Sequence, residues 1–158
     1  MKFETRDAVY EDIDHLKELS RKLSLKEEDE FDQTVDPEWT TSEEAEDYFD
    51  SRINEENGFA IVAESGEEII GYLVGGVNPA EEFRDTDQIA EAETMYIEPE
   101  YRGKGLGSEM FEEFLDWSKE KDAERARVEA SAGNTGAINF YREHDFENYS
   151  ITLERKLD

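Results

Sequence analysis

A short glycine-rich segment carries two cationic side chains and has the residue types for binding an anion: Arg102-Gly103-Lys104-Gly105-Leu106-Gly107-Ser108. Glycine has no side chain, so the backbone of such a segment can approach a ligand closely. The amphipathic pattern that follows predicts a helix, and the first N–H groups of a helix have no acceptor within it and lie at the positive end of its dipole. The segment is therefore predicted to bind phosphate groups.

The spacing of the glycines differs from two common nucleotide-binding patterns. The third glycine, Gly107, falls one residue before the place that G-x-G-x-x-G requires, and the Gly-Lys-Ser/Thr ending of a P-loop is missing. The sequence thus disfavours a dinucleotide site and a nucleoside triphosphate site.

A second segment with chemical potential follows after one predicted helix and one predicted strand. It reads Asn134-Thr135-Gly136-Ala137-Ile138-Asn139-Phe140-Tyr141, with Phe146 shortly beyond it. Asn is a favoured N-cap residue, so Asn134 is predicted to begin a short helix. That helix would carry Tyr141, whose phenol can donate or accept a proton.

Both segments resemble motifs of the GCN5-related N-acetyltransferases. Met95 to Ser108 is similar to the acetyl-CoA-binding motif Q/R-x-x-G-x-G/A, with Arg102, Gly105 and Gly107 in its fixed places. The second segment is similar to the family's next motif, although Asp145 stands where the family usually has glycine. Asp tolerates the left-handed turn expected there better than most residues. The order of predicted elements agrees with the family over nearly the whole chain.

The resemblance implies acetyl-CoA as co-substrate and no metal. In the family, backbone N–H groups of the glycine loop hold the pyrophosphate, and the preceding strand pairs with pantetheine as with an extra strand. A strand N–H near Ile97 would then stabilise the oxyanion at the thioester carbonyl. The implied cofactor-binding residues are Met95, Tyr96, Ile97, Arg102, Gly103, Lys104, Gly105, Leu106, Gly107, Ser108, Asn134 and Tyr141.

Acetyl transfer to an amine needs a proton removed from the amine and a proton delivered to the leaving thiolate. The resemblance places the general acid at Tyr141. For the base, Glu91 and Glu93 share strand parity with Met95 and Ile97, so all four would point to one face if the strand has no bulge. A water chain is the alternative to either carboxylate. Tyr141 as a core residue, and the glutamates as solvated strand residues, are the structural alternatives.

The elements that position these residues predict an α+β domain. Apolar residues at spacings of three and four predict a helix from about Tyr10, and Thr41 or Ser42 is predicted to cap a second helix that ends before Gly58. Two apolar runs around Ser65-Gly66 predict a hairpin. Further strands are expected at residues 3–6, 89–97, 126–131 and 146–157, and the helix after Gly105 has an inward stripe that includes Phe111 and Phe114. We expect one N-acetyltransferase domain over residues 1–158, with a mixed, mostly antiparallel sheet of roughly six to seven strands and about four helices.

Charge bounds the function further, because 44 acidic and 17 basic side chains give a formal net charge of −27 over 158 residues. A nucleic-acid binder needs a basic surface, so that class is excluded. The chain contains no cysteine and two histidines, which leaves little for a metal centre, and both His15 and His144 are expected at the surface. Neither a membrane span nor a secretory signal is expected, and the cytoplasm is the expected compartment. The acidic composition favours a halophilic origin, and its rival is a functional acidic surface.

The sequence therefore predicts transfer of acetyl from acetyl-CoA to a primary amine, by direct attack in a ternary complex. The acceptor is a small molecule or a protein amine, and the prediction allows a homodimer. Residues 26–39 and 78–87 are predicted to form acidic loops that wall the acceptor pocket, which suits a cationic acceptor. The alternatives are a non-catalytic acyl-CoA-binding module and an acidic protein-interaction domain that mimics nucleic acid.

Overall fold

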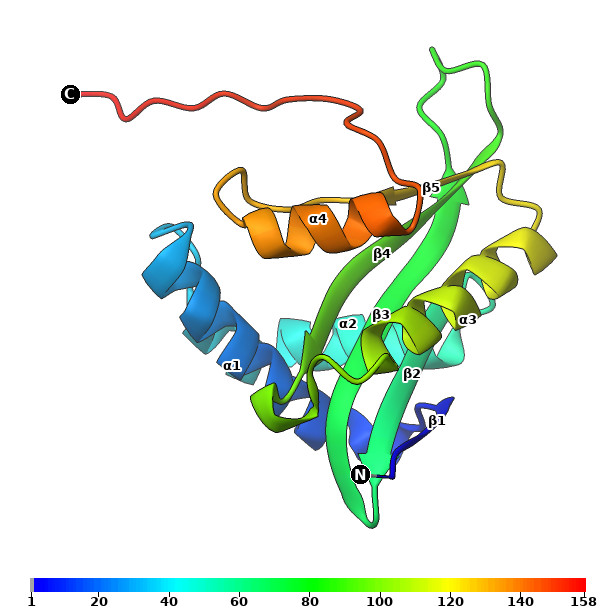
Figure 1. Cartoon of the computed structure of the whole chain (residues 1–158). Coiled ribbons are helices and arrows are strands. Elements are labelled where there is room, and N and C mark those ends of the chain that lie inside the picture. Colours follow the sequence, from blue (N-terminus) through cyan, green and yellow to red (C-terminus); the bar gives the residue numbers. More distant parts are fainter. Residues whose placement is uncertain (1) are drawn as a thin grey trace.

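A computed structural model describes residues 2–158 and contains one mixed sheet flanked by helices (Figure 1). The strands follow one another in the sheet in the order of the sequence. They are β1 (Glu4–Asp7), β2 (Gly58–Ser65), β3 (Glu68–Pro79), β4 (Gln88–Ile97) and β5 (Arg125–Val128). The helices are α1 (Ile13–Glu30), α2 (Glu43–Asn54), α3 (Leu106–Glu120) and α4 (Thr135–Glu143), with short 3₁₀ turns at Tyr10–Asp12, Pro37–Thr41 and Pro99–Tyr101. The predicted α+β class is confirmed.

The sheet is antiparallel from β1 to β4, and β4 pairs with β5 in parallel. The predicted hairpin is the β2–β3 pair, and Gly66 in its turn has a φ of +65°, which suits glycine. Of the two predicted caps, Ser42 is the one that begins α2, because its hydroxyl accepts a hydrogen bond from the Ala45 N–H at 3.1 Å.

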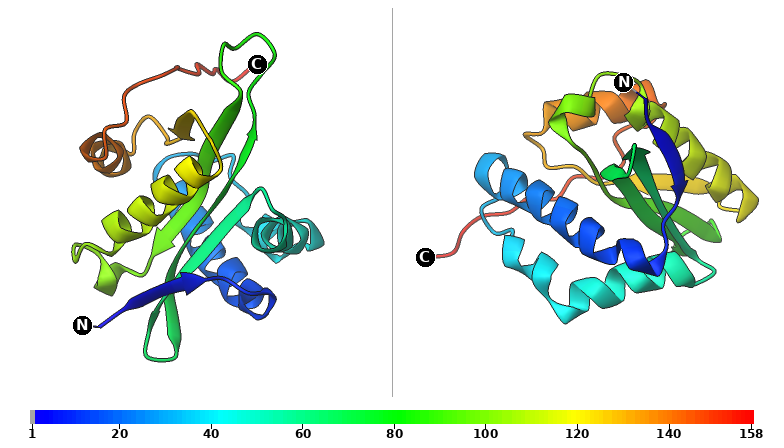
Figure 2. Two further views of the ribbon diagram at one scale, coloured as in Figure 1. Left: turned by 90° about the vertical axis from the view of Figure 1, so that its right-hand side faces the viewer. Right: turned by 90° about the horizontal axis from the view of Figure 1, so that it is seen from below.

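Helices cover both faces of the sheet, as Figure 2 shows. One core cluster joins α1 and α2 to one face and includes Leu16, Phe49 and Tyr72. The other joins α3 and α4 to the opposite face and includes Leu106, Met110, Phe111 and Phe114. The apolar stripe predicted for α3 is thus the centre of the second cluster.

The sheet has five strands within residues 2–158, so the prediction of six to seven is wrong. The missing strand is the one expected at 146–157, which extends away from the body without strand pairing (Figure 1). Its side chains Ile151 and Leu153 are 81% and 91% exposed. The alternating apolar pattern is real, but a strand also needs an edge to pair with, and sequence pattern alone does not supply one.

Helix α1 is longer than predicted, since it continues through Glu30 into the segment expected to be an acidic loop from Lys26. Residues 22–30 are mostly Lys, Leu and Glu, which have high helix propensity, and the Phe31 N–H still bonds to the Glu27 carbonyl at 2.9 Å. Acidic composition was therefore a poor guide to loop structure here. The extension places Glu27 on a rigid helix.

Candidate active site

The glycine loop has the backbone geometry of an anion site. Gly103 and Gly105 have φ values of +73° and +85°, in the left-handed region that favours glycine. Gly105 is the N-cap of α3, and the first bond within the helix is from the Glu109 N–H to the Gly105 carbonyl at 3.0 Å. The N–H groups of residues 106–108 therefore have no acceptor within the helix and point out of its N-terminus.

Arg102 is held at the start of this loop by two contacts. Its Nε donates to the Ile97 carbonyl at 2.7 Å, and its guanidinium lies over the Tyr96 ring at 5.1 Å from the centroid. Its side chain thus fixes the loop against the end of β4, whereas the Lys104 side chain is exposed.

Beside the loop, the second half of β4 has a free edge. Pairing between β4 and β5 ends at Ala92 and Val128, while β4 stays paired with β3 up to Ile97. The Glu98 N–H donates to β3 at the Ile70 carbonyl, 2.8 Å away. Backbone groups alternate in direction along a strand, so those of Ile97 and Met95 face away from β3, toward the open edge. An extended ligand can pair with this edge.

A β-bulge at Glu93 separates the side chains that the sequence placed on one face. Val74 pairs with Thr94 and the next residue, Gly75, pairs with Ala92, so Glu93 has no partner on β3. Met95 and Ile97 pack in the α3–α4 cluster, whereas Glu93 contacts α2. The predicted shared face of Glu91, Glu93, Met95 and Ile97 is therefore wrong, because an extra residue reverses the alternation.

Glu93 is bound by two residues of α2. Arg52 donates to both of its carboxylate oxygens, with Nε at 2.6 Å and Nη2 at 3.0 Å, and the Tyr48 hydroxyl donates at 2.9 Å. The Arg52 guanidinium also lies 4.9 Å from the centre of the Tyr48 ring. A bidentate pair of this kind fixes the position and orientation of a carboxylate.

Glu91 has a different environment. Burial, followed by the charges of Glu93 and Glu129, raises the pKa of its carboxyl above the ordinary value, although Arg127 and Arg52 oppose the shift. No hydrogen bond joins it to a cation within the described chain. Of the two carboxylates predicted as candidate bases, Glu91 is the one without a hydrogen-bonded cationic partner over residues 2–158, and it is free to accept a proton.

Tyr141 lies on α4, and its ring packs among aromatic side chains of α3 and α4. Its ring centre is 5.6 Å from that of Phe111 and 6.1 Å from that of Phe146. Burial, followed by the charge of Glu27, raises the pKa of its phenol. The hydroxyl is therefore protonated at neutral pH, as a proton donor must be.

Asn134 and Asp145 take the predicted structural positions at the ends of α4. The Asn134 side-chain oxygen accepts from the Ala137 N–H at 3.1 Å, which leaves its amide NH₂ free to donate elsewhere. Asp145 has a φ of +68°, the left-handed turn for which the family uses glycine.

His144 was predicted to lie at the surface, and this prediction is wrong. Its ring stacks on Phe140 with 4.8 Å between centres, and Nε2 lies 3.1 Å from the Ser108 hydroxyl in the first turn of α3. No sequence pattern predicts this contact, because the two residues are far apart in the chain.

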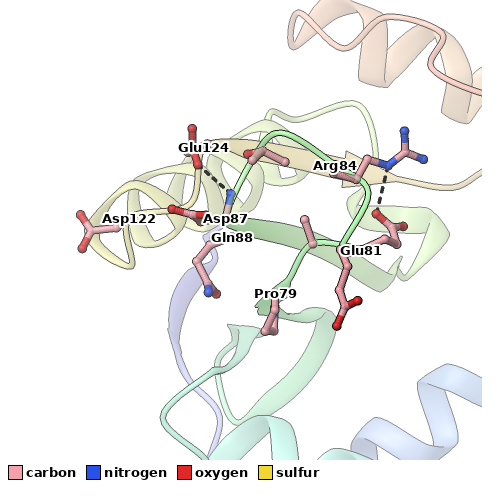
Figure 3. Close-up of a pocket in the computed structure, with 10 residues that line it drawn as sticks. Pro79, Glu81, Arg84, Asp87, Gln88, Asp122 and Glu124 are labelled. Carbon is pink, nitrogen blue, oxygen red and sulfur yellow. Dashed lines mark hydrogen bonds and ion pairs between the residues drawn. The ribbon is translucent and has the colours of Figure 1, made fainter.

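A hollow of ≈ 770 Å³ lies elsewhere, between the β3–β4 loop and the start of β5 (Figure 3). Glu81, Asp87 and Glu124 line it, and Glu124 accepts from the Asp87 N–H at 2.8 Å. Ten residues of strand at about 3.3 Å each separate this end of β4 from the glycine loop. The loop at 78–87 thus lies at the end of β4 away from the glycine loop, which the sequence could not place.

Within residues 2–158, no cluster of three or more His, Cys, Asp or Glu side chains has the arrangement of a metal site. Over the same range, none of the helices is both long and apolar enough to cross a membrane.

Comparison with known proteins gives one consistent result. Residues 23–146 match the family described as the acetyltransferase (GNAT) family. An uncharacterized N-acetyltransferase of Archaeoglobus fulgidus is 24% identical over 107 residues, which is 68% of this chain and 72% of that protein.

Solved structures share the fold. A predicted acetyltransferase of Clostridium acetobutylicum, solved with acetyl-CoA, has a TM-score of 0.77 at 22% identity and covers 98% of this chain and 96% of its own. AAC(6')-Iy in complex with the bisubstrate analogue CoA-S-monomethyl-acetylneamine has a TM-score of 0.76 at 14% identity, with all of both chains covered. At these identities the likeness shows the fold.

Proposed function

Because the chain belongs to the acetyltransferase (GNAT) family and is an acetyl-CoA-dependent N-acetyltransferase, we propose that it acetylates a primary amine by direct attack in a ternary complex. The observation that carries the proposal is the open edge of β4 at residues 94–97 beside the free N–H groups of the glycine loop. One region thus offers strand pairing for an amide-containing arm and donors for phosphates.

The residues present fit acetyl-CoA. In this proposal the N–H groups of Gly103 to Ser108 bind the pyrophosphate, with Arg102 holding the loop and Lys104 adding positive charge. The backbone of Met95, Tyr96 and Ile97 forms the wall for the pantetheine arm, and the Asn134 NH₂ donates to that arm or to a water. Bound acetyl-CoA supplies an activated acyl group with a thiolate as leaving group.

Two proton movements complete the reaction. The neutral amine forms a bond to the thioester carbonyl carbon, the carbon–sulfur bond breaks, and the leaving sulfur takes the proton of the Tyr141 hydroxyl. The proton lost by the amine nitrogen goes to Glu91, directly or through a water. We assign the base to Glu91 and not to Glu93, because the pair with Arg52 holds Glu93 in a structural contact.

The acceptor in this proposal is a cationic amine of low molecular weight or on a protein surface. The high negative charge of the chain attracts such a molecule, and AAC(6')-Iy, which shares the fold, binds an analogue that contains an acetylated neamine.

The experiment that tests the function combines binding and turnover. Calorimetry is expected to detect acetyl-CoA binding, and a thiol reagent is expected to detect release of CoA with members of a panel of monoamines, diamines, lysine peptides and aminoglycosides. Binding without thiol release across the panel would instead establish a non-catalytic acyl-CoA-binding module. Absence of both would exclude the proposed function.

We further propose that the acidic surface is an adaptation to high salt, which is the composition argument for a halophilic origin. Circular dichroism in molar and in millimolar KCl measures this directly. Loss of folding at low salt is the expected result, and an unchanged spectrum favours a recognition role for the acidic surface.

A further inference from the structure

One face of α1 is directed toward the sheet over its whole length and ends in a carboxylate. Leu16 and Ser20 on this face are buried, and Leu23 packs against the same cluster. Glu27 follows Leu23 by four residues, so it continues the same face of the helix. Its side chain is half-buried, whereas the neighbouring Asp29 is exposed.

Contacts on either side of Glu27 locate this end of α1. Lys22 pairs with Glu98, just after β4, with 2.9 Å between Nζ and the carboxylate oxygen. Burial, and after it the charge of Glu27, raises the pKa of the Tyr141 phenol on α4. A Cβ built at Gly133, just before α4, would lie 3.7 Å from the Phe31 ring, so the end of α1 and the start of α4 are in contact. Glu27 therefore lies between the end of β4 and the start of α4, the helix that carries the proposed general acid.

The cations near Glu27 on its own helix are engaged elsewhere. Arg21 pairs with Glu38 at 2.8 Å, Lys22 with Glu98 at 2.9 Å, and Lys26 lies 4.0 Å from Glu30. Over residues 2–158, Glu27 takes part in no ion pair or side-chain hydrogen bond. Burial and the charge of Asp32 raise the pKa of its carboxyl, so keeping this group charged in the free protein costs free energy.

A carboxylate in this position discriminates between the charges of an acceptor. The attacking nitrogen must be neutral, and a carboxylate bound to it would stabilise the protonated form, which does not react. A second ammonium group on the same molecule stays protonated throughout the reaction and gains from a carboxylate at every stage.

We propose that Glu27 binds a second cationic group of the acceptor, so that diamines and related polycationic amines are preferred over monoamines. This inference rests on the proposed function, and it makes Glu27 a specificity-determining residue. Neither the motifs nor the comparisons assign it a role.

The test compares 1,4-diaminobutane with 1-aminobutane, which have the same carbon chain and differ in one charge. Calorimetry on the full-length protein saturated with CoA, at constant ionic strength, gives the two dissociation constants, and thiol release with acetyl-CoA gives the two kcat/KM values. Two equivalent amino groups alone give the diamine an advantage of about twofold. We expect the wild-type protein to favour the diamine by about tenfold or more, in both the dissociation constant and kcat/KM.

Glu27→Gln is expected to reduce this preference to about twofold, measured as the ratio of the diamine constant to the monoamine constant within one variant, so that any change common to both amines cancels. Asp29→Asn is the matched control, because it removes the same charge from the exposed side of the same helix, and it is expected to retain the preference. A preference that survives Glu27→Gln, that falls equally in Asp29→Asn, or that the wild type lacks would overturn the proposal.

The binding arm separates this proposal from the proposed function. If the diamine preference in binding depends on Glu27 but no amine releases thiol, the site for a second cation stands and the transferase reaction fails. If amines release thiol but the preference does not depend on Glu27, the reaction stands and this proposal fails.

Discussion

The two faces of β4 differ in chemistry although they belong to one strand. One face is apolar and presents Ala90, Ala92, Met95 and Ile97 to the cluster under α3 and α4. On the opposite side, Glu93 bonds to α2, Thr94 bonds to the buried Tyr72 hydroxyl at 2.7 Å, and Tyr96 packs with the α1–α2 cluster. The glycine loop follows the strand directly, so the proposed cofactor and acceptor sites depend on the same backbone.

The difference arises from the bulge at Glu93. Ala92 and Met95 are an odd number of residues apart, yet both face α3 and α4, which a regular strand does not permit. The lesson is that one extra residue reassigns side chains between faces, at the point where the pairing with β5 ends. Variants in the glycine loop, on α4 and along β4 test whether the two sides of the strand act separately.

The largest effect is expected from Gly105→Glu at the N-cap of α3. The variant forces a side chain into φ = +85° and adds a negative charge where the phosphates are proposed to bind, so acetyl-CoA affinity should fall by about 100-fold or more. No heavy atom lies within 4 Å of the added Cβ, so the fold should persist. Calorimetry measures the affinity.

Gly66→Glu is its control, because Gly66 has a φ of +65° and equally open surroundings in the β2–β3 turn. It carries the same backbone strain away from the proposed site. Retained affinity in Gly105→Glu, or equal loss in both variants, would count against the loop as the phosphate site.

Tyr141→Phe is expected to lower kcat by about 100-fold, the usual size for loss of a general acid, with little change in acetyl-CoA affinity. The ring remains in the aromatic cluster, so stability should hardly change. Tyr149→Phe, in the exposed C-terminal segment, is the matched control. Unchanged kcat in Tyr141→Phe would reduce Tyr141 to a packing residue.

Gly75→Ala tests the bulge itself. An added Cβ would lie 2.1 Å from the Glu91 carbonyl oxygen, so β3 and β4 must separate, and the free energy of unfolding should fall by about 2–3 kcal/mol. Denaturant unfolding measures this. Gly136→Ala in α4 is the control: its Cβ would have 3.9 Å to the nearest atom, and it should gain up to about 1 kcal/mol.

The pair Glu91→Gln and Glu93→Gln should separate catalysis from structure. Glu91→Gln should lower kcat by about tenfold or more and remove the rise of activity with pH, because the base must be deprotonated. Glu93→Gln leaves Arg52 without its charged partner. It should therefore lower the melting temperature and leave kcat nearly unchanged. Equal effects on kcat would contradict the assignment of Glu91.

The smallest effect is on stability near neutral pH. The folded pKa of Glu91 is raised, so the folded state binds more protons and loses stability as pH rises from the ordinary carboxyl pKa through the raised one. Above that range Glu91→Gln should melt about 1–2 °C higher than wild type, since the site is half-exposed and the gain modest. Thermal scans on both sides of the range check it, and a lower melting temperature would show that the Glu91 charge is stabilising.

Much of the fold was predictable because local rules determine it. Ser42 and Asn134 are N-caps, the Ser65-Gly66 turn joins the hairpin, and the spacing of Phe111 and Phe114 marks the buried face of α3. Likewise, the amphipathic pattern after the glycine-rich segment predicts α3. These features depend on residues close together in the chain.

What the sequence could not give are contacts between distant segments. The bulge at Glu93 requires Gly75 on the neighbouring strand, the engagement of Glu93 requires Arg52, and the position of His144 requires Ser108. The role of Glu27 could not be predicted, because the acidic composition around it predicts a loop and not the end of a helix. The predicted strand at 146–157 failed for the same reason, because a strand exists only with a partner.

The split between β4 and β5 has a consequence for how freely this sequence can diverge. Pairing groups at the open edge and donors at the α3 N-terminus are main-chain atoms, which every residue type except proline provides in full. A site built from main-chain atoms depends on the shape of the backbone, which a few glycines and one arginine contact maintain here. Most of its side chains are therefore free to vary. If the proposed sites are right, related chains can exchange acceptors by altering the opposite face of one strand while the backbone groups that would bind the cofactor stay unchanged.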